Sequence, residues 1–141
     1  MLIKQIFFVL SCYWLSGCDF QANAMHLPLN VEAQGNNICV YTNNKRTFLD
    51  ESDINSKYFI YIINPGNNNE KKIQYDFTIG ENNFPVEKKD CLLLPIDNLN
   101  LNQPYDFYIS TDKLFTVRVC ILREGSEYQT KKVHSTENCE E

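Results

Sequence analysis

The stretch Ile73-Gln74-Tyr75-Asp76-Phe77-Thr78-Ile79 alternates apolar and polar side chains along its whole length. Successive side chains of a β-strand point to opposite faces, so the apolar members of this stretch would share one face. Its polar members would then face water. The stretch therefore predicts a strand in an antiparallel sheet that is covered on one side only.

Two later segments repeat this alternation, with apolar positions at Phe115, Val117, Val119 and Ile121 in one and at Tyr105, Phe107 and Ile109 in the other. Residues 58–63 are apolar on both faces, so we expect a central strand there. No segment has a sustained helical period, although residues 50–55 have the composition of one short helical turn.

From residue 36 to residue 133 the chain is a series of short runs rich in β-branched and aromatic residues, separated by Asn, Asp, Gly and Pro. The runs predict about seven strands, at residues 37–42, 58–63, 73–79, 91–95, 105–110, 115–122 and 127–133. Pro65-Gly66-Asn67-Asn68-Asn69 has the composition of a hairpin loop. Because seven strands are typical of that class, we predict an all-β, immunoglobulin-like β-sandwich.

The N-terminus carries a different signal. Lys4 precedes an apolar run too short to span a membrane, and Leu15-Ser16-Gly17-Cys18 follows it. This arrangement resembles the leader and lipobox of bacterial lipoproteins. The resemblance implies that residues 1–17 are removed and that Cys18 receives acyl chains such as palmitate. The alternative is a plain secretory leader with an incidental Cys18, and either leader would export the chain.

We therefore expect a protein that faces the periplasm and is anchored to a bacterial membrane through Cys18. Asp19 resembles the inner-membrane retention signal of enterobacteria-like sorting, but other bacterial groups differ, so the choice of membrane stays open. Pro28 and Asn30 interrupt any regular period, so residues 18–35 are interpreted as a lipidated tether. The sandwich would then occupy residues 36–133, followed by an acidic tail at 134–141.

Charge and cysteine content narrow the functional classes. Leader removal takes Lys4 from the 13 basic residues and leaves all 18 acidic residues, so the mature formal charge is −6. This balance disfavours nucleic acid as a partner; it indicates simple solubility or attraction to a cationic partner. Apart from Cys12 and Cys18, four cysteines remain, which allow three disulfide connectivities. In an oxidising compartment we favour two structural bridges over metal binding, namely Cys39–Cys91 and Cys120–Cys139. The first would join non-neighbouring strands, and in the second Cys120 would face away from the core and hold the acidic tail.

Catalytic motifs are not apparent in the sequence. His26 lies in the predicted tether and His134 near the tail, and neither phosphate loops nor zinc motifs occur. We therefore expect a protein that is not an enzyme and has no cofactor besides the covalent lipid. The loop carboxylates Asp50, Glu51 and Asp53 are interpreted either as a solvated rim or as a surface for a basic partner.

Several motifs together resemble the periplasmic lipoproteins that confer immunity in type VI secretion. Besides the lipobox, they are Asn37-Ile38-Cys39-Val40, Asp90-Cys91-Leu92-Leu93-Leu94-Pro95, Gln103-Pro104-Tyr105-Asp106-Phe107 and the alternating segment 115–121. The resemblance covers roughly residues 36–122, and Cys120 and Cys139 lie outside the family pattern.

This resemblance implies an antidote that binds and neutralises a protein toxin delivered by kin cells. The interface candidates are Tyr41, Tyr61, Tyr108, Asp50, Glu51 and Asp53, although for each tyrosine packing in the core is the favoured interpretation. Two alternatives remain: a structural lipoprotein of an envelope or secretion assembly, and a lysozyme-type inhibitor, which the acidic charge would suit.

Overall fold

The computed structural model describes residues 26–44, 57–66, 72–78, 84–111 and 113–140, and these residues are organised mainly in strands. The strands are β1 (His26–Pro28), β2 (Asn30–Gln34), β3 (Asn37–Tyr41), β4 (Lys57–Ile63), β5 (Ile73–Thr78), β6 (Leu92–Pro95), β7 (Pro104–Ser110), β8 (Leu114–Glu124) and β9 (Glu127–Lys132). Two short 3-10 turns, η2 (Lys88–Asp90) and η3 (Ile96–Asn98), flank β6. The all-β prediction is confirmed.

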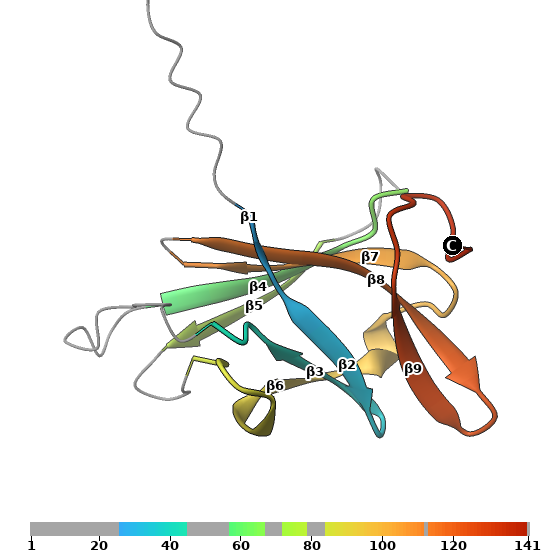
Figure 1. Cartoon of the computed structure of the whole chain (residues 1–141), viewed down its shortest axis with the longest axis horizontal. Coiled ribbons are helices and arrows are strands. Elements are labelled where there is room, and N and C mark those ends of the chain that lie inside the picture. Colours follow the sequence, from blue (N-terminus) through green and yellow to red (C-terminus); the bar gives the residue numbers. More distant parts are fainter. Residues whose placement is uncertain (1–25, 45–56, 67–71, 79–83, 112, 141) are drawn as a thin grey trace, which may run out of the picture.

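The strands form two sheets that face each other (Figure 1). The larger sheet has the order β1-β8-β7-β4-β5, with β9 also paired to β8, and the smaller sheet has the order β2-β3-β6. All pairings are antiparallel except that of β1 with β8. As the loop composition predicts, β4 and β5 are adjacent antiparallel strands.

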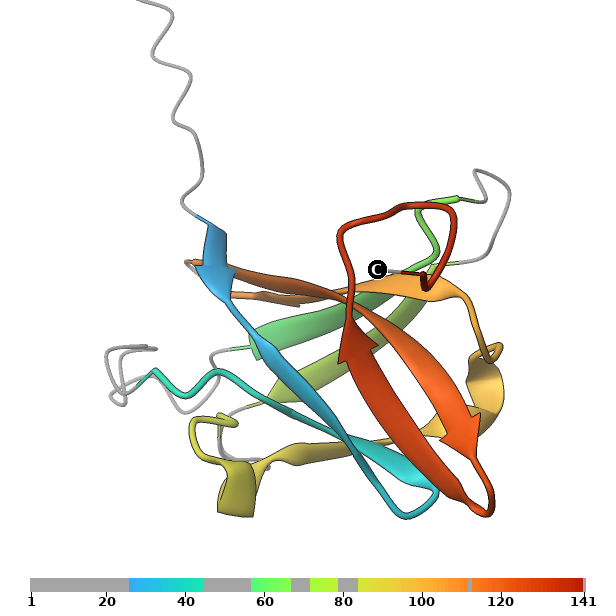
Figure 2. The ribbon, with the colours of Figure 1, turned by 45° about the vertical axis from the view of Figure 1, so that its right-hand side comes forward.

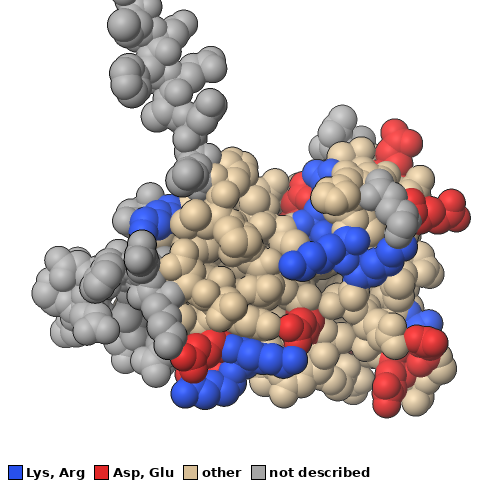
Figure 3. Space-filling model, in the orientation of Figure 1, with Lys and Arg blue, Asp and Glu red and all other residues tan. Residues whose placement is uncertain are grey.

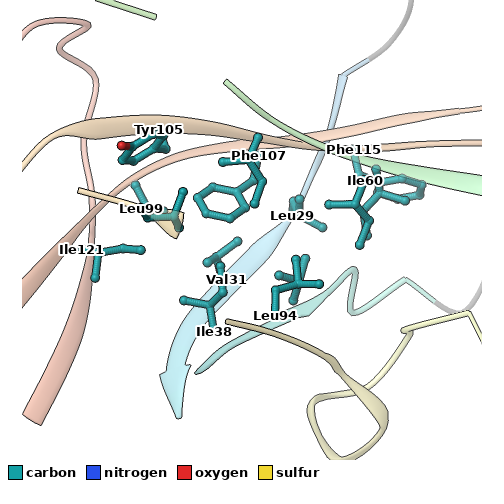
Figure 4. Close-up of a cluster of buried hydrophobic side chains, with 14 of the residues drawn as sticks. Leu29, Val31, Ile38, Ile60, Leu94, Leu99, Tyr105, Phe107, Phe115 and Ile121 are labelled. Carbon is teal, nitrogen blue, oxygen red and sulfur yellow. The ribbon is translucent and has the colours of Figure 1, made fainter. Parts of the chain in front are cut away.

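The core lies between the two sheets, where apolar side chains from both layers interdigitate. Figure 4 shows Val31, Ile38 and Leu94 of the small sheet opposite Phe107 and its neighbours of the large sheet. The fully buried side chains of the large sheet include Tyr58, Ile60, Phe107, Ile109, Phe115, Val119 and Ile121. Burial of apolar surface on this scale is the main stabilising contribution to such a fold.

Burial follows the predicted alternation closely. In β5, Ile73, Tyr75 and Phe77 pack against the core, whereas Gln74 and Asp76 are exposed. The predicted central strand is β4, which lies between β5 and β7. Each of the seven predicted strands therefore has a counterpart, but the described residues contain two more.

Both additional strands lie in the segment predicted to be a tether, and this prediction was wrong from His26 onward. Leu29 and Val31 are only 1% and 3% exposed, so this segment is part of the core. Leu27, Leu29, Val31 and Ala33 alternate with polar residues and Pro28, a period that the proline obscured. Pro28 is tolerated because it is the last residue of the short edge strand β1.

The N-terminal segment crosses from one sheet to the other, as Figure 1 shows. β1 pairs with β8 of the large sheet, and after Leu29 the chain continues as β2 beside β3 of the small sheet. Figure 2 shows the β8–β9 hairpin bending toward the turn between β2 and β3. There the Thr130 hydroxyl donates a hydrogen bond of 3.0 Å to the Val31 carbonyl, so β9 connects the two layers on this side.

Several sequence predictions lie outside the described residues. They are the leader, the lipobox with Cys18 and Asp19, and the short helical turn at 50–55 with Asp50, Glu51 and Asp53. Within the described ranges, no helix is long and apolar enough to cross a membrane.

Candidate functional site

The outer face of the large sheet carries large apolar side chains at positions where a solvent-facing sheet normally has polar ones. Phe59, Tyr61 and Ile63 point outward from β4 because they alternate with buried residues, and Tyr108 points outward from β7. All four side chains are half-buried. We call these four residues the aromatic face.

The aromatic rings of this face lie next to one another on the neighbouring strands β4 and β7. Phe59 and Tyr61 are stacked, with ring centroids 6.2 Å apart and planes 16° from parallel. Tyr61 lies opposite Tyr108 of β7 in the strand register and opposite Gln74 of β5 on its other side. Lys72 places its Nζ 3.5 Å from the centroid of the Tyr61 ring.

A partly buried ion pair adjoins Tyr108 on this face. Arg118 Nε lies 2.6 Å from Asp106 Oδ1, and Arg118 Nη2 lies 2.9 Å from Asp106 Oδ2. The Tyr108 hydroxyl donates a hydrogen bond of 3.4 Å to the same carboxylate. Burial, together with the negative charge of Asp106, raises the pKa of Tyr108, so this phenol is neutral at physiological pH.

The C-terminal tail is fixed at one end of the same face. Cys120 points outward from β8, and its disulfide with Cys139 covers it completely. The Arg118 Nη1 group donates to the His134 carbonyl at 2.8 Å, and Lys131 Nζ donates to the Cys139 carbonyl at 3.0 Å. Acidic side chains project from the region of this tail in Figure 3.

A second candidate surface lies on the outer face of the small sheet. The Tyr41 hydroxyl donates to Glu32 Oε1 at 2.6 Å, and Lys88 forms an ion pair with the same carboxylate. Hydrogen bonds from Lys88 and Tyr41 lower the pKa of Glu32, whereas the Glu32 carboxylate raises the pKa of Tyr41. These contacts form a small polar network at the surface.

Beside this network is a hollow of about 460 Å³. Its lining consists of Glu32, Ala33, Gln34, Cys39, Lys88, Lys89, Cys91 and Leu93. Leu93 is 53% exposed, so a large apolar side chain meets solvent there. The two lysines at the rim form ion pairs with Glu32 and Glu87, and therefore neither sign of charge dominates.

The structure separates the tyrosines that the sequence grouped as interface candidates. Tyr61 and Tyr108 are neighbours on the aromatic face, whereas Tyr41 lies on the outer face of the opposite sheet. A single flat interface cannot include all three. Sequence reasoning missed Phe59 and Lys72; the signal for Phe59 was available, because residues 58–63 are apolar at every position.

Both predicted disulfides, Cys39–Cys91 and Cys120–Cys139, are present. The expectation that the first would join non-neighbouring strands needs correction. Cys39 lies in β3, Cys91 immediately precedes β6, and these strands are paired in the small sheet. That bridge therefore reinforces two adjacent strands, while the other attaches the tail to the large sheet.

In the part of the chain that the structure describes, His, Cys, Asp and Glu side chains do not form any group of three or more that could bind a metal ion. The two histidines, His26 and His134, are both exposed.

Comparison of the chain with protein-family models, curated proteins and solved structures found no match. The described residues present two candidate surfaces, the aromatic face of the large sheet and the hollow beside the small sheet.

Proposed function

We propose that this chain is a periplasm-facing, lipid-anchored immunity protein that binds and neutralises a toxin delivered by type VI secretion from kin cells. The observation that carries a binding role is the aromatic face. Phe59, Tyr61, Ile63 and Tyr108 occupy outward positions on adjacent strands of a sheet whose other face is the core. A contiguous patch of apolar side chains on a protein surface often marks a site of interaction with another molecule.

The chemistry of the face suits protein recognition. Tyrosine is enriched among the residues that contribute most to binding energy, because it combines a large rigid ring with a polar hydroxyl group. The face lies on β4 and β7, which are held by strands on both sides, so its side chains are positioned before a partner arrives. An interface of about 1,600 Å² centred there would cover a toxin's active site. The protein would act by occlusion, without catalysis and without a cofactor other than its covalent lipid.

The topology supports an immunoglobulin-like class for the sandwich. Assigning β2, β3 and β6 to strands A, B and E, and β8, β7 and β4 to strands G, F and C, gives one ABE and one GFC sheet. Tyr105 at the start of β7 accepts a hydrogen bond of 3.0 Å from the Asn100 backbone, which is comparable to the tyrosine corner of such domains. Phe107 stands where antibody domains have the second cysteine of their inter-sheet bridge, so the resemblance does not extend to that disulfide.

Lipidation at Cys18 would place this domain close to a membrane. Residues 19–25 separate Cys18 from β1 and could span at most about 25 Å when fully extended. Confinement to a thin layer raises the effective concentration of the antidote where a toxin arrives. Labelling with radioactive palmitate would test this step, since incorporation should be lost in Cys18→Ala.

The central experiment is competition between kin cells. A strain that lacks this gene is mixed with parental cells that have either an intact or a disabled type VI apparatus. We expect the deletion strain to be killed only by attackers with an intact apparatus, and to survive when the gene is restored. Equal survival beside both attackers would contradict the proposed function.

A second candidate is a structural lipoprotein of an envelope assembly, and the sheet edges favour it. Among the described residues, β5 pairs only with β4 and β6 only with β3, so each presents an edge to which another strand could be added. This role predicts loss of assembly on deletion even without attackers, which electron microscopy of the envelope or a secretion assay would detect.

A further inference from the structure

We propose that the partner inserts a lysine or arginine side chain over the Tyr61 ring, which makes Tyr61 a cation-binding position at the centre of the aromatic face. This inference rests on the proposed function and names the chemistry of its partner. It predicts that the toxin surface opposite Tyr61 carries a positive charge.

The first observation is that this ring already binds a cation from its own chain. Lys72 lies just before β5 and places its ammonium 3.5 Å from the Tyr61 ring centroid. An ammonium within about 6 Å of an aromatic centroid is attracted by the negative face of the ring. Lys72 is exposed, and so a partner's cation could replace it without opening the core.

The second observation is the set of groups around the ring. Phe59 stacks beside Tyr61 and extends the aromatic surface, and Tyr108 is its register neighbour on β7. Asp76 lies on the same outward face of β5, opposite Phe59, and accepts a hydrogen bond of 2.7 Å from Gln74. A cation over Tyr61 would therefore have π-surface beneath it and a carboxylate two register positions away on β5.

The third observation concerns the cations already on this face of the sheet. The Arg118 guanidinium is bonded to Asp106 and to the His134 carbonyl, and Lys131 is bonded to the Cys139 carbonyl. Lys57 lies at the opposite end of β4 from the tail. Arg118 and Lys131 are therefore engaged within the chain, and the net charge of −5 on the whole chain gives a long-range attraction for a cationic partner.

The test uses the competition assay with the full-length lipidated chain, so that the toxin need not be purified. The deletion strain is complemented with wild type, Tyr61→Phe or Tyr61→Leu and is challenged with parental attackers. Phenylalanine keeps the aromatic ring, whereas leucine keeps apolar bulk without a π-face. A cation–π contact desolvated in an interface is worth roughly 10- to 30-fold in affinity, so Tyr61→Leu should lose most protection and Tyr61→Phe should retain it.

Two further variants control the interpretation. Tyr128 also has a cation near its ring, since the Arg123 guanidinium carbon lies 5.7 Å from its centroid, but it belongs to the β8–β9 hairpin. Tyr128→Leu should therefore protect as wild type does. Lys72→Gln removes the internal competitor and should protect at least as well as wild type. Immunoblotting verifies equal amounts, and Tyr61→Ile, which favours strands, replaces Tyr61→Leu if the latter does not accumulate.

The outcomes separate the two proposals. Survival of the uncomplemented deletion strain would overturn the proposed function, and this inference with it. If wild type protects and Tyr61→Leu, or its substitute Tyr61→Ile, protects equally, the cation site is wrong while the immunity function stands. Loss of protection in Tyr61→Phe would also overturn the inference, because the hydroxyl group rather than the ring would then be required.

Discussion

Arg118 and Asp106 face each other on β8 and β7, and Arg118 bonds both oxygens of the Asp106 carboxylate while also bonding the His134 carbonyl of the tail. One guanidinium thus connects two central strands of the large sheet to the C-terminal segment. The Asp106 side chain is only 11% exposed, so Arg118 supplies hydrogen bonds that water would otherwise provide. The Arg118–Asp106 ion pair therefore contacts both the tail and Tyr108 of the aromatic face.

Substituting Arg118 by Gln should lower the free energy of unfolding by about 2 kcal/mol, because it leaves the Asp106 carboxylate buried without its cation. Urea unfolding of the purified domain would measure this loss. Arg123→Gln is the matched control, since Arg123 lies on the same strand but is exposed, and it should cost less than about 0.5 kcal/mol. Equal effects of the two substitutions would contradict the role given to Arg118.

The two disulfides should differ in their contribution to stability. Cys39–Cys91 closes a separation of 52 residues and Cys120–Cys139 one of 19. The chain-entropy model gives about 4 kcal/mol for the longer loop and about 3 kcal/mol for the shorter. Urea unfolding should therefore show a larger loss of the free energy of unfolding when Cys39 and Cys91 are both replaced by Ala than when Cys120 and Cys139 are. The reverse order would indicate that the Cys120–Cys139 bridge stabilises the protein by more than its effect on chain entropy.

Gly66 allows the close approach of the tail to the end of β4. A Cβ at this position would lie 2.9 Å from the Thr136 carbonyl oxygen, closer than real contacts allow. Gly66→Ala should therefore cost about 1–2 kcal/mol, because the tail must shift. In a background with Cys120 and Cys139 both replaced by Ala, the tail can move and the cost should fall below about 0.5 kcal/mol. An unchanged cost in that background would show that the tail is not the strained element.

The stability of the small sheet should depend on the charge of Glu32. Its pKa is lowered in the folded state below the ordinary value of 4.5, so its stabilising contribution is present above pH 4.5 and is lost as the pH falls through the lowered pKa. Glu32→Gln should therefore melt below wild type at pH 7, and the difference should shrink as the pH is lowered below 4.5. Glu127→Gln, exposed on β9, is the control and should not change the melting temperature anywhere in this range. A difference between wild type and Glu32→Gln that does not shrink as the pH falls would rule out the carboxylate charge as its cause.

Much of the fold could be predicted from period-2 alternation. In β7 and β8 every predicted core residue, from Tyr105 to Ile121, points inward, although Val117 is only half-buried. The same reasoning placed Cys120 on the outer side of its strand, where Cys139 reaches it. Local alternation was sufficient there because each strand has one face on the core and one face outward.

Alternation could not reveal how strands are shared between sheets. Leu29 and Val31 belong to a segment that crosses between the layers, and Pro28 concealed its period. Tyr41, Tyr61 and Tyr108 look equivalent in sequence, but sheet order places Tyr41 on the opposite outer surface. Strand order depends on contacts between distant residues, and a single sequence pattern does not encode these directly.

Photo-crosslinking from the aromatic face tests the central claim most directly. A benzoylphenylalanine introduced at Tyr61, at Tyr108 or, on the opposite sheet, at Tyr41 would be irradiated in cells growing together with parental attackers. We predict one covalent adduct of the same mass from positions 61 and 108, with a secreted protein identified in it, and no adduct from position 41. An adduct from position 41 alone would place the partner on the small sheet and contradict the account.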